Sequence, residues 1–177
     1  MTKTFEVFGP YEIDRDRVFE NAWQKDGWDY VNQAAGGRLS DAIGIYIFSL
    51  RNGRNYKPIY VGLTTKQKFS KEVFNQRNLR MISQLDSRNG WMKGTICLHL
   101  LGKRKEKQVG FARPRRDWLQ ALEALMIFIC RRKNPALLNR KHTAWLDGVG
   151  IGGITSNAAM KGKPPHAINT LRNVMDW

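Results

Sequence analysis

Two short segments near the middle of the chain are rich in β-branched and aromatic residues, and a polar loop separates them. They run from Gly44 to Phe48 and from Pro58 to Gly62. The loop between them contains an Asn-Gly pair, which is a strong short-range signal for a hairpin turn. The pattern predicts a β-hairpin over about residues 43–63.

Side chains alternate between the two faces of a strand, so the sequence also assigns the faces of this hairpin. The residues expected to share one face are Ile43, Ile45 and Ile47 on the first strand and Ile59, Val61 and Leu63 on the second. Tyr46 and Tyr60 then lie on the opposite face of their strands. If the registers match, the two phenols stand side by side on a surface backed by aliphatic side chains.

Apolar residues at helical spacing predict helices before and after the hairpin. The predicted helices run from Asp14 or Asp16 to about Gln24, over residues 70–84, and over residues 114–133. Ser70 is the expected N-cap of the second helix, and Pro114 suits the first turn of the third. The first helix is expected to lie over the sheet.

Three further strands and a closing helix are predicted on weaker patterns. They are Phe5–Phe8, ended by Gly9-Pro10, the nearly continuous apolar run Thr95–Leu101, a short strand over Ala136–Asn139, and a helix over 167–175. Continuous apolar character favours a central, buried place for Thr95–Leu101. Together the elements predict an α/β fold in which helices flank a small antiparallel β-sheet.

The charge of the chain favours a polyanionic partner. Lys and Arg number 30 against 15 Asp and Glu, which gives a formal charge of +15, and nucleic acid is the partner such an excess indicates. No basic amphipathic helix or long apolar run predicts membrane association, and the N-terminal residues lack a secretory signal. Two isolated cysteines and three scattered histidines show no metal-ligand spacing. We expect a cytoplasmic protein without structural zinc.

A loop between the predicted strand and the third helix is dense in cations. Its basic residues are Lys103, Arg104, Lys105, Lys107, Arg113, Arg115 and Arg116, and Glu106 is its one carboxylate. Two interpretations are open at this point. The run is either an ordinary solvated loop or a loop that contacts phosphates.

Glu123 is the single carboxylate between Trp118 and Asn134, on a predicted helix that is otherwise apolar there. A carboxylate beside an apolar face costs free energy unless it reaches solvent or pairs with a cation or metal. Glu123 therefore forms a salt bridge with a flanking arginine or binds a metal ion.

The ordered set of Gly44-Ile45-Tyr46, Tyr60-Val61-Gly62, a helical Glu123 and Asn139 resembles the GIY-YIG nuclease family. The resemblance covers about residues 43–140. It implies a nuclease core over 43–141, with an N-terminal extension at 1–42 and a C-terminal extension at 142–177.

The resemblance implies a metal-dependent endonuclease that hydrolyses phosphodiester bonds of DNA, with RNA not excluded. Tyr46 or Tyr60 would take a proton from water, and Lys66 or Lys68 would lower the phenol pKa. The phosphate clamp would be Arg77, with Arg80 as its substitute, and Asn139 would orient neighbouring groups. Glu123 would bind Mg²⁺ or Mn²⁺.

The expected nucleic-acid contacts are cations outside that catalytic set. They are Lys66, Lys68, Arg80, Lys103, Arg104, Lys105, Arg115 and Arg116. The alternative interpretation is a catalytically weak or inactive relative that binds DNA or RNA. Both interpretations predict a basic surface and an affinity that falls with salt.

Overall fold

The computed structural model describes residues 4–14, 22–86 and 94–139. The chain divides into two units, residues 1–138 and residues 139–177. All the helices and strands described below lie in the first unit. The predicted helix over 167–175 lies outside the described residues.

The first unit is an α/β fold built on a four-stranded antiparallel sheet with the strand order β1-β4-β2-β3. Its elements in chain order are β1 (Glu6–Ile13), α2 (Ala22–Ala34), the short 3-10 helix η1 (Leu39–Asp41), β2 (Gly44–Asn52), β3 (Asn55–Thr64), α3 (Phe69–Glu72), α4 (Gln76–Asp86), β4 (Thr95–Gly102) and α5 (Arg116–Lys133). The predicted fold class and the central position of Thr95–Leu101 are confirmed.

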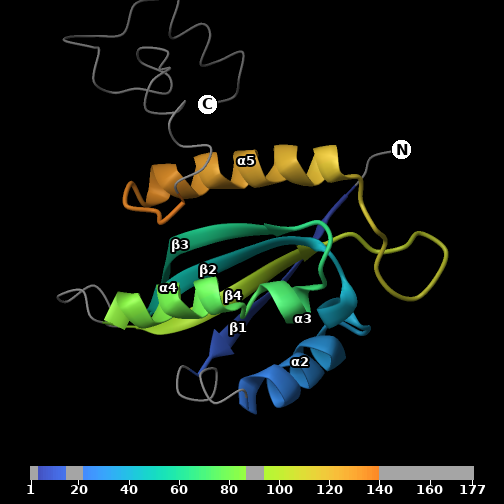
Figure 1. Ribbon diagram of the computed structural model, residues 1–177, viewed down its shortest axis with the longest axis horizontal. Coiled ribbons are helices and arrows are strands. Elements are labelled where there is room, and N and C mark those ends of the chain that lie inside the picture. The colour runs from blue at the N-terminus through green and yellow to red at the C-terminus, as the bar shows by residue number, and fades with distance from the viewer. Residues whose placement is uncertain (1–3, 15–21, 87–93, 140–177) are drawn as a thin grey trace, which may run out of the picture. The chain divides into compact units, whose positions relative to one another are not determined.

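Helices cover both faces of this sheet. Helix α5 runs along one face, whereas α2, α3 and α4 lie toward the other (Figure 1). The smaller core cluster joins Ile45, Val61 and Leu101 of the sheet to Ile127 of α5. The larger cluster lies on the opposite face and contains Tyr46, Phe48, Leu98, Val31, Phe69 and Ile82.

Strand β1 is longer than the sequence predicted. The strand continues through Gly9-Pro10, where the register with β4 shifts between Phe8 and Tyr11. Since β1 is an edge strand, a proline that lacks an N–H costs it no ladder bond to a further neighbour. The prediction that Gly9-Pro10 ends the strand is therefore wrong.

The helices also begin and end at other residues than expected. Helix α2 extends to Ala34 because Trp28, Val31 and Ala35 recur at helical spacing and are buried; residues 15–21 lie outside the described part. The single helix predicted over 70–84 is two helices. Asn75 separates them, since its Oδ1 accepts the N–H of Asn78 at 2.9 Å and caps α4. Ser70 is no N-cap, because α3 begins one residue earlier.

The segment after α5 closes the outer edge of β3. Asn134 is buried and its Nδ2 donates to the carbonyl of Pro58 at 2.6 Å. The N–H of Leu138 donates to the carbonyl of Ile59 at 2.9 Å. The predicted strand over Ala136–Asn139 does not form, because the chain turns here with the Leu137 N–H bonded to the Asn134 carbonyl.

The predicted hairpin is confirmed, with one irregularity. Strands β2 and β3 pair from Gly44 opposite Thr64 to Asn52 opposite Asn55. The register shifts between the Phe48–Tyr60 and Ser49–Pro58 pairs, so Ile59 is an extra residue in β3. Ile59 consequently packs in the larger core cluster and does not share the face of Val61, as had been expected.

The glycines of the hairpin are required by close packing. Gly62 lies directly opposite Tyr46, and a Cβ atom on Gly62 would lie 2.0 Å from Cζ of that ring. A Cβ atom on Gly44 would lie 2.0 Å from the carbonyl oxygen of Leu101. Neither position can hold a side chain without movement of the sheet or of the Tyr46 ring.

We predict that Gly62→Ala destabilises the protein by about 1–3 kcal/mol, because the added methyl group overpacks the hairpin. Urea unfolding followed by circular dichroism measures the change. Gly37→Ala is the matched control, since its Cβ would meet the Phe111 ring at an ordinary 3.8 Å. Equal stability of the two variants would contradict the close contact between Gly62 and Tyr46.

Candidate active site at the edge of the sheet

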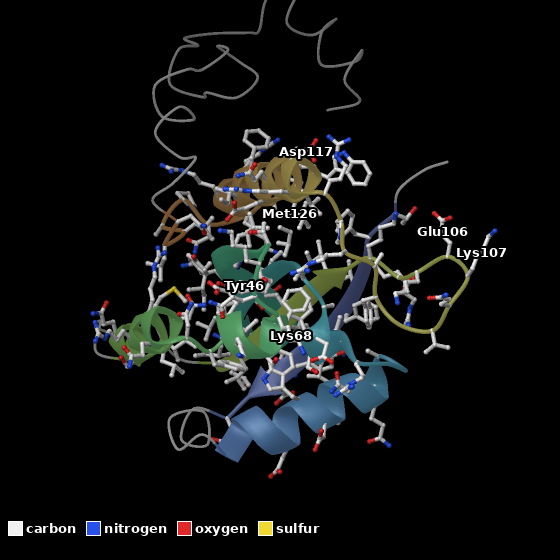
Figure 2. All side chains as sticks on the ribbon, turned by 45° about the vertical axis from the view of Figure 1, so that its right-hand side comes forward. Tyr46, Lys68, Glu106, Lys107, Asp117 and Met126 are labelled. Carbon is white, nitrogen blue, oxygen red and sulfur yellow. The ribbon has the colours of Figure 1, made fainter. Side chains whose placement is uncertain are left out.

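Tyr46 lies in the interior, on the face of the sheet that α4 covers. Its side chain is 2% exposed, and its ring centroid lies 6.2 Å from that of Tyr60. The Nδ2 of Asn78, on α4, donates a hydrogen bond to its hydroxyl oxygen at 2.9 Å. The two phenols thus lie side by side as predicted, but not on an open surface, because Tyr46 is buried in the larger core cluster (Figure 2).

Tyr60 lies on the edge strand β3 and is half-buried. Burial raises its pKa, and a hydrogen bond with Tyr46 opposes that rise. Asn78, Tyr46 and Tyr60 therefore lie in a row, with Asn78 as the donor to the Tyr46 hydroxyl and Tyr60 beside Tyr46.

Charged side chains from two helices act on these phenols. Burial raises the pKa of Tyr46 far above its ordinary value, and it is also the main cause of the shift at Tyr60. The positive charge of Arg77, on α4, lowers the pKa of both phenols. The negative charge of Glu123, on α5, raises the pKa of Tyr60. The Tyr60 phenol is therefore within electrostatic reach of a cation on α4 and a carboxylate on α5, the helices on the two sides of the sheet.

Arg77 replaces the lysines that the sequence predicted near the phenols. Lys68 pairs instead with Asp41, with 2.9 Å between Nζ and Oδ1. Lys66 is exposed, and its carbonyl accepts a hydrogen bond from Arg113. The expectation that Lys66 or Lys68 lowers a phenol pKa is not met, because neither charge is among those that shift Tyr46 or Tyr60.

The two arginines of α4 differ in their relation to the tyrosines. Both are exposed, but only the charge of Arg77 is among the causes that shift the two phenols. Arg77 is thus the arginine of α4 whose charge acts on the phenols, and its role as the phosphate clamp stays a prediction. Asn139 is buried and is the first residue of the second unit, and its orienting role stays a prediction.

The basic loop before α5 folds back on itself. Lys105 N–H bonds to the Gly110 carbonyl at 3.1 Å, and Ala112 N–H bonds to the Lys103 carbonyl at 2.7 Å. Glu106 and Lys107 lie at its tip, away from the sheet (Figure 2). The loop thus presents cations well outside the layers of the fold.

Arg104 is a structural residue of this loop. Its Nε lies 2.8 Å from Glu6 Oε2, and its Nη2 donates to the Ala35 carbonyl at 2.6 Å. The guanidinium also lies 5.3 Å and 5.2 Å from the ring centroids of Phe8 and Phe111. Because these contacts join β1, the end of α2 and the loop, the predicted phosphate contact for Arg104 is replaced by a role in the fold.

The other predicted nucleic-acid contacts fall into two groups. Arg115 pairs with Asp117 at 2.6 Å and lies over the Trp118 ring. The side chains of Lys103, Lys105 and Arg116 form no ion pair with any carboxylate that the structure describes. Among the predicted contacts of the loop region, these three keep their charge available to a ligand.

Asn78 and Glu72 are site residues that sequence reasoning missed. Asn78 is 1% exposed, and the negative charge of Glu72 raises the pKa of both phenols. A signal for Asn78 was present, since it occupies the apolar stripe of Phe74 and Ile82 at four-residue spacing. An amide in such a stripe must find a buried partner.

No protein-family model, curated protein or solved structure matches the chain. None of the helices in the described residues is long and apolar enough to cross a membrane. The class of protein is thus described by its fold and its candidate site, an antiparallel α/β domain with two adjacent tyrosines on β2 and the edge strand β3.

Proposed function

We propose that this protein is a divalent-metal-dependent endonuclease that hydrolyses DNA phosphodiester bonds, of the type that the GIY-YIG resemblance implies. The observation that carries the proposal is the setting of Tyr60. This phenol lies beside Tyr46, with 6.2 Å between the two ring centroids, and is within electrostatic reach of Arg77 and Glu123. Those are the residue types that phosphodiester hydrolysis requires.

In the proposed reaction, Tyr60 takes a proton from the attacking water. Tyr60 is better placed than Tyr46, since it is half-buried whereas Tyr46 is 2% exposed. Tyr46 stays protonated and donates its hydrogen bond to the developing phenolate. Arg77 is exposed on α4 and clamps the scissile phosphate, where a planar guanidinium can form two hydrogen bonds.

Glu123 is the residue that would hold Mg²⁺ or Mn²⁺. Within the described residues no group of three or more His, Cys, Asp or Glu side chains could hold a metal ion. A single carboxylate still fits Mg²⁺, which commonly keeps several waters and takes further ligands from substrate phosphates. When bound there, the ion supplies positive charge for the leaving oxygen.

The charge of the chain supports a nucleic-acid substrate. The formal charge of +15 is accompanied by loop cations that pair with no described carboxylate. Cations of this kind release counterions when they meet phosphates, which gives salt-dependent affinity.

A second candidate function is nucleic-acid binding without cleavage, and the raised phenol pKa values favour it. Burial raises the pKa of both Tyr46 and Tyr60 above their ordinary values, which makes each phenol a weaker source of phenolate at neutral pH. If Tyr60 is catalytic, its pKa must therefore be lowered by Arg77 and by the bound substrate.

Incubation with supercoiled plasmid DNA separates the two candidates. The enzyme produces nicked and linear forms in Mg²⁺ and none in EDTA. The binding protein shifts the mobility of the same DNA in EDTA and yields no cleavage products in either condition.

We predict unequal effects of removing the two hydroxyl groups. Tyr60→Phe should lower the single-turnover cleavage rate by about 10²–10⁴, the usual effect of losing a general base, and Tyr46→Phe should lower it less. Both variants should fold, because Phe keeps each ring and Asn78 Nδ2 retains the carbonyls of Glu72 and Val73 as acceptors at 3.1 and 3.0 Å. Full activity in both folded variants would refute the active-site role of the pair.

Glu123→Gln should lower cleavage by about 10²-fold or more while leaving DNA affinity in EDTA unchanged. The substitution also removes the negative charge that raises the pKa of Tyr60, so on its own that effect would ease ionisation of the phenol. A lost rate then points to the missing metal ligand. Glu106→Gln at the loop tip is the control, and equal activity in the two variants would contradict the assignment.

The loop cations should determine part of the salt dependence. Replacing Lys103 and Lys105 together with Ser should reduce the slope of log affinity against log salt by about 0.9 for each lost phosphate contact. Their backbone bonds do not involve the side chains, so the loop keeps its shape. Arg54→Ser, in the turn between β2 and β3, is the control and should leave the slope unchanged. An unchanged slope in the variant that lacks both Lys103 and Lys105 would show that the loop is ordinary solvated surface.

A further inference from the structure

Asn78 is a buried polar residue in the middle of an apolar contact between α4 and the sheet. Its side chain is 1% exposed, and Phe74 and Ile82 lie one turn away on either side with exposures of 5% and 1%. A buried amide costs free energy unless its hydrogen bonds are made. The hydrogen-bond partners of the Asn78 side chain therefore indicate its role.

The amide group of Asn78 acts toward Tyr46 as a donor. Its Nδ2 lies 2.9 Å from Tyr46 Oη, 3.0 Å from the Val73 carbonyl oxygen and 3.1 Å from the Glu72 carbonyl oxygen. The two carbonyl oxygens fix the amide orientation, because a side-chain oxygen in that place would face two acceptors. The hydroxyl oxygen of Tyr46 therefore accepts a hydrogen bond from Asn78. The proton of the Tyr46 hydroxyl can then be donated to a different acceptor.

We infer that Asn78 is a positioning residue, which holds the Tyr46 hydroxyl as an acceptor and so directs the Tyr46 proton to the oxygen of Tyr60. The effect of Asn78 on the reaction rests on the proposed function, whereas its effect on the orientation of the Tyr46 hydroxyl does not. In the reaction, a proton directed at Tyr60 stabilises negative charge on that oxygen when the water is deprotonated.

Other groups around Tyr60 act on this direction less directly. Arg77, Glu123 and Glu72 act on Tyr60 through their charges, whereas Asn78 contacts the Tyr46 hydroxyl oxygen itself. The orientation depends on the Asn78–Tyr46 contact, which is the one described hydrogen bond that joins α4 to either phenol.

A purely structural role for Asn78 can be tested against its neighbour Asn75. The Nδ2 of Asn75 lies 3.1 Å from Glu72 Oε1, and its Oδ1 accepts the Asn78 N–H at 2.9 Å. Both asparagines thus join α3 to α4, but the bonds of Asn75 lead to Glu72 and the backbone. Asn75→Ala is the matched control for loss of structure at the helix junction.

The orientation is measured by carbon-13 NMR of protein labelled at Cζ of its five tyrosines, at neutral pH without metal or nucleic acid. Tyr46→Phe and Tyr60→Phe assign the two signals. In Asn78→Leu the Tyr46 hydroxyl loses its donor and is no longer held as an acceptor, so the Tyr60 signal should move in the same direction as in Tyr46→Phe. Asn78→Leu combined with Tyr46→Phe should show no movement of Tyr60 beyond that of Tyr46→Phe alone, and Asn75→Ala should leave the Tyr60 signal in place.

The same variants give the effect on rate. Asn78→Leu should lower the single-turnover cleavage rate about tenfold, the size of one lost hydrogen bond, with unchanged DNA affinity and no further loss when Tyr46→Phe is added. Asn78→Ala, which removes the donor with a smaller side chain, serves if the Leu variant melts early. An unmoved Tyr60 signal in both Asn78 variants, or an equal movement in Asn75→Ala, overturns the inference. Moved signals without cleavage by the wild type would instead refute the proposed function.

Discussion

The contact of the Tyr46 ring with the backbone of Gly62 is the constraint on which the site depends. The ring occupies the space that a Cβ atom on Gly62 would need, and the hydroxyl is buried with it. A buried hydroxyl requires a partner. Asn78 meets that requirement from α4, and this hydrogen bond ties the helix to the hairpin at the point where Tyr60 reaches the edge of the sheet.

Burial and chemistry place opposite demands on the two tyrosines. Burial stabilises the fold through the rings and raises both phenol pKa values, which opposes proton transfer at neutral pH. The edge position of β3 relieves this conflict for one residue. Tyr60 keeps one side toward the core, while Arg77 and Glu123 approach from helices on different faces of the sheet. An interior strand could not offer a phenol to both helices in this way.

The sequence predicted those features that depend on local alternation, and it failed where distant contacts decide. The hairpin, the central strand β4 and the Tyr46–Tyr60 pair follow from side-chain periodicity and turn chemistry. The bulge at Ile59 and the turn after Asn134 do not, because each depends on packing between β3 and its neighbours. The break between α3 and α4 rests on a single capping side chain, Asn75, whose signal is easily hidden within a continuous apolar pattern.

The charge run before α5 shows why composition alone does not assign phosphate contacts. Arg104 and Lys105 are adjacent in sequence and equal in charge. Arg104 contacts Glu6, the Ala35 carbonyl and two aromatic rings, whereas Lys105 is exposed in the folded-back loop. A guanidinium can form several hydrogen bonds and stack on aromatic rings at the same time. An arginine in such a loop can therefore make structural contacts within the fold, as Arg104 does. Lys103, Lys105 and Arg116 form no ion pair with a described carboxylate, so their charge is kept for a ligand.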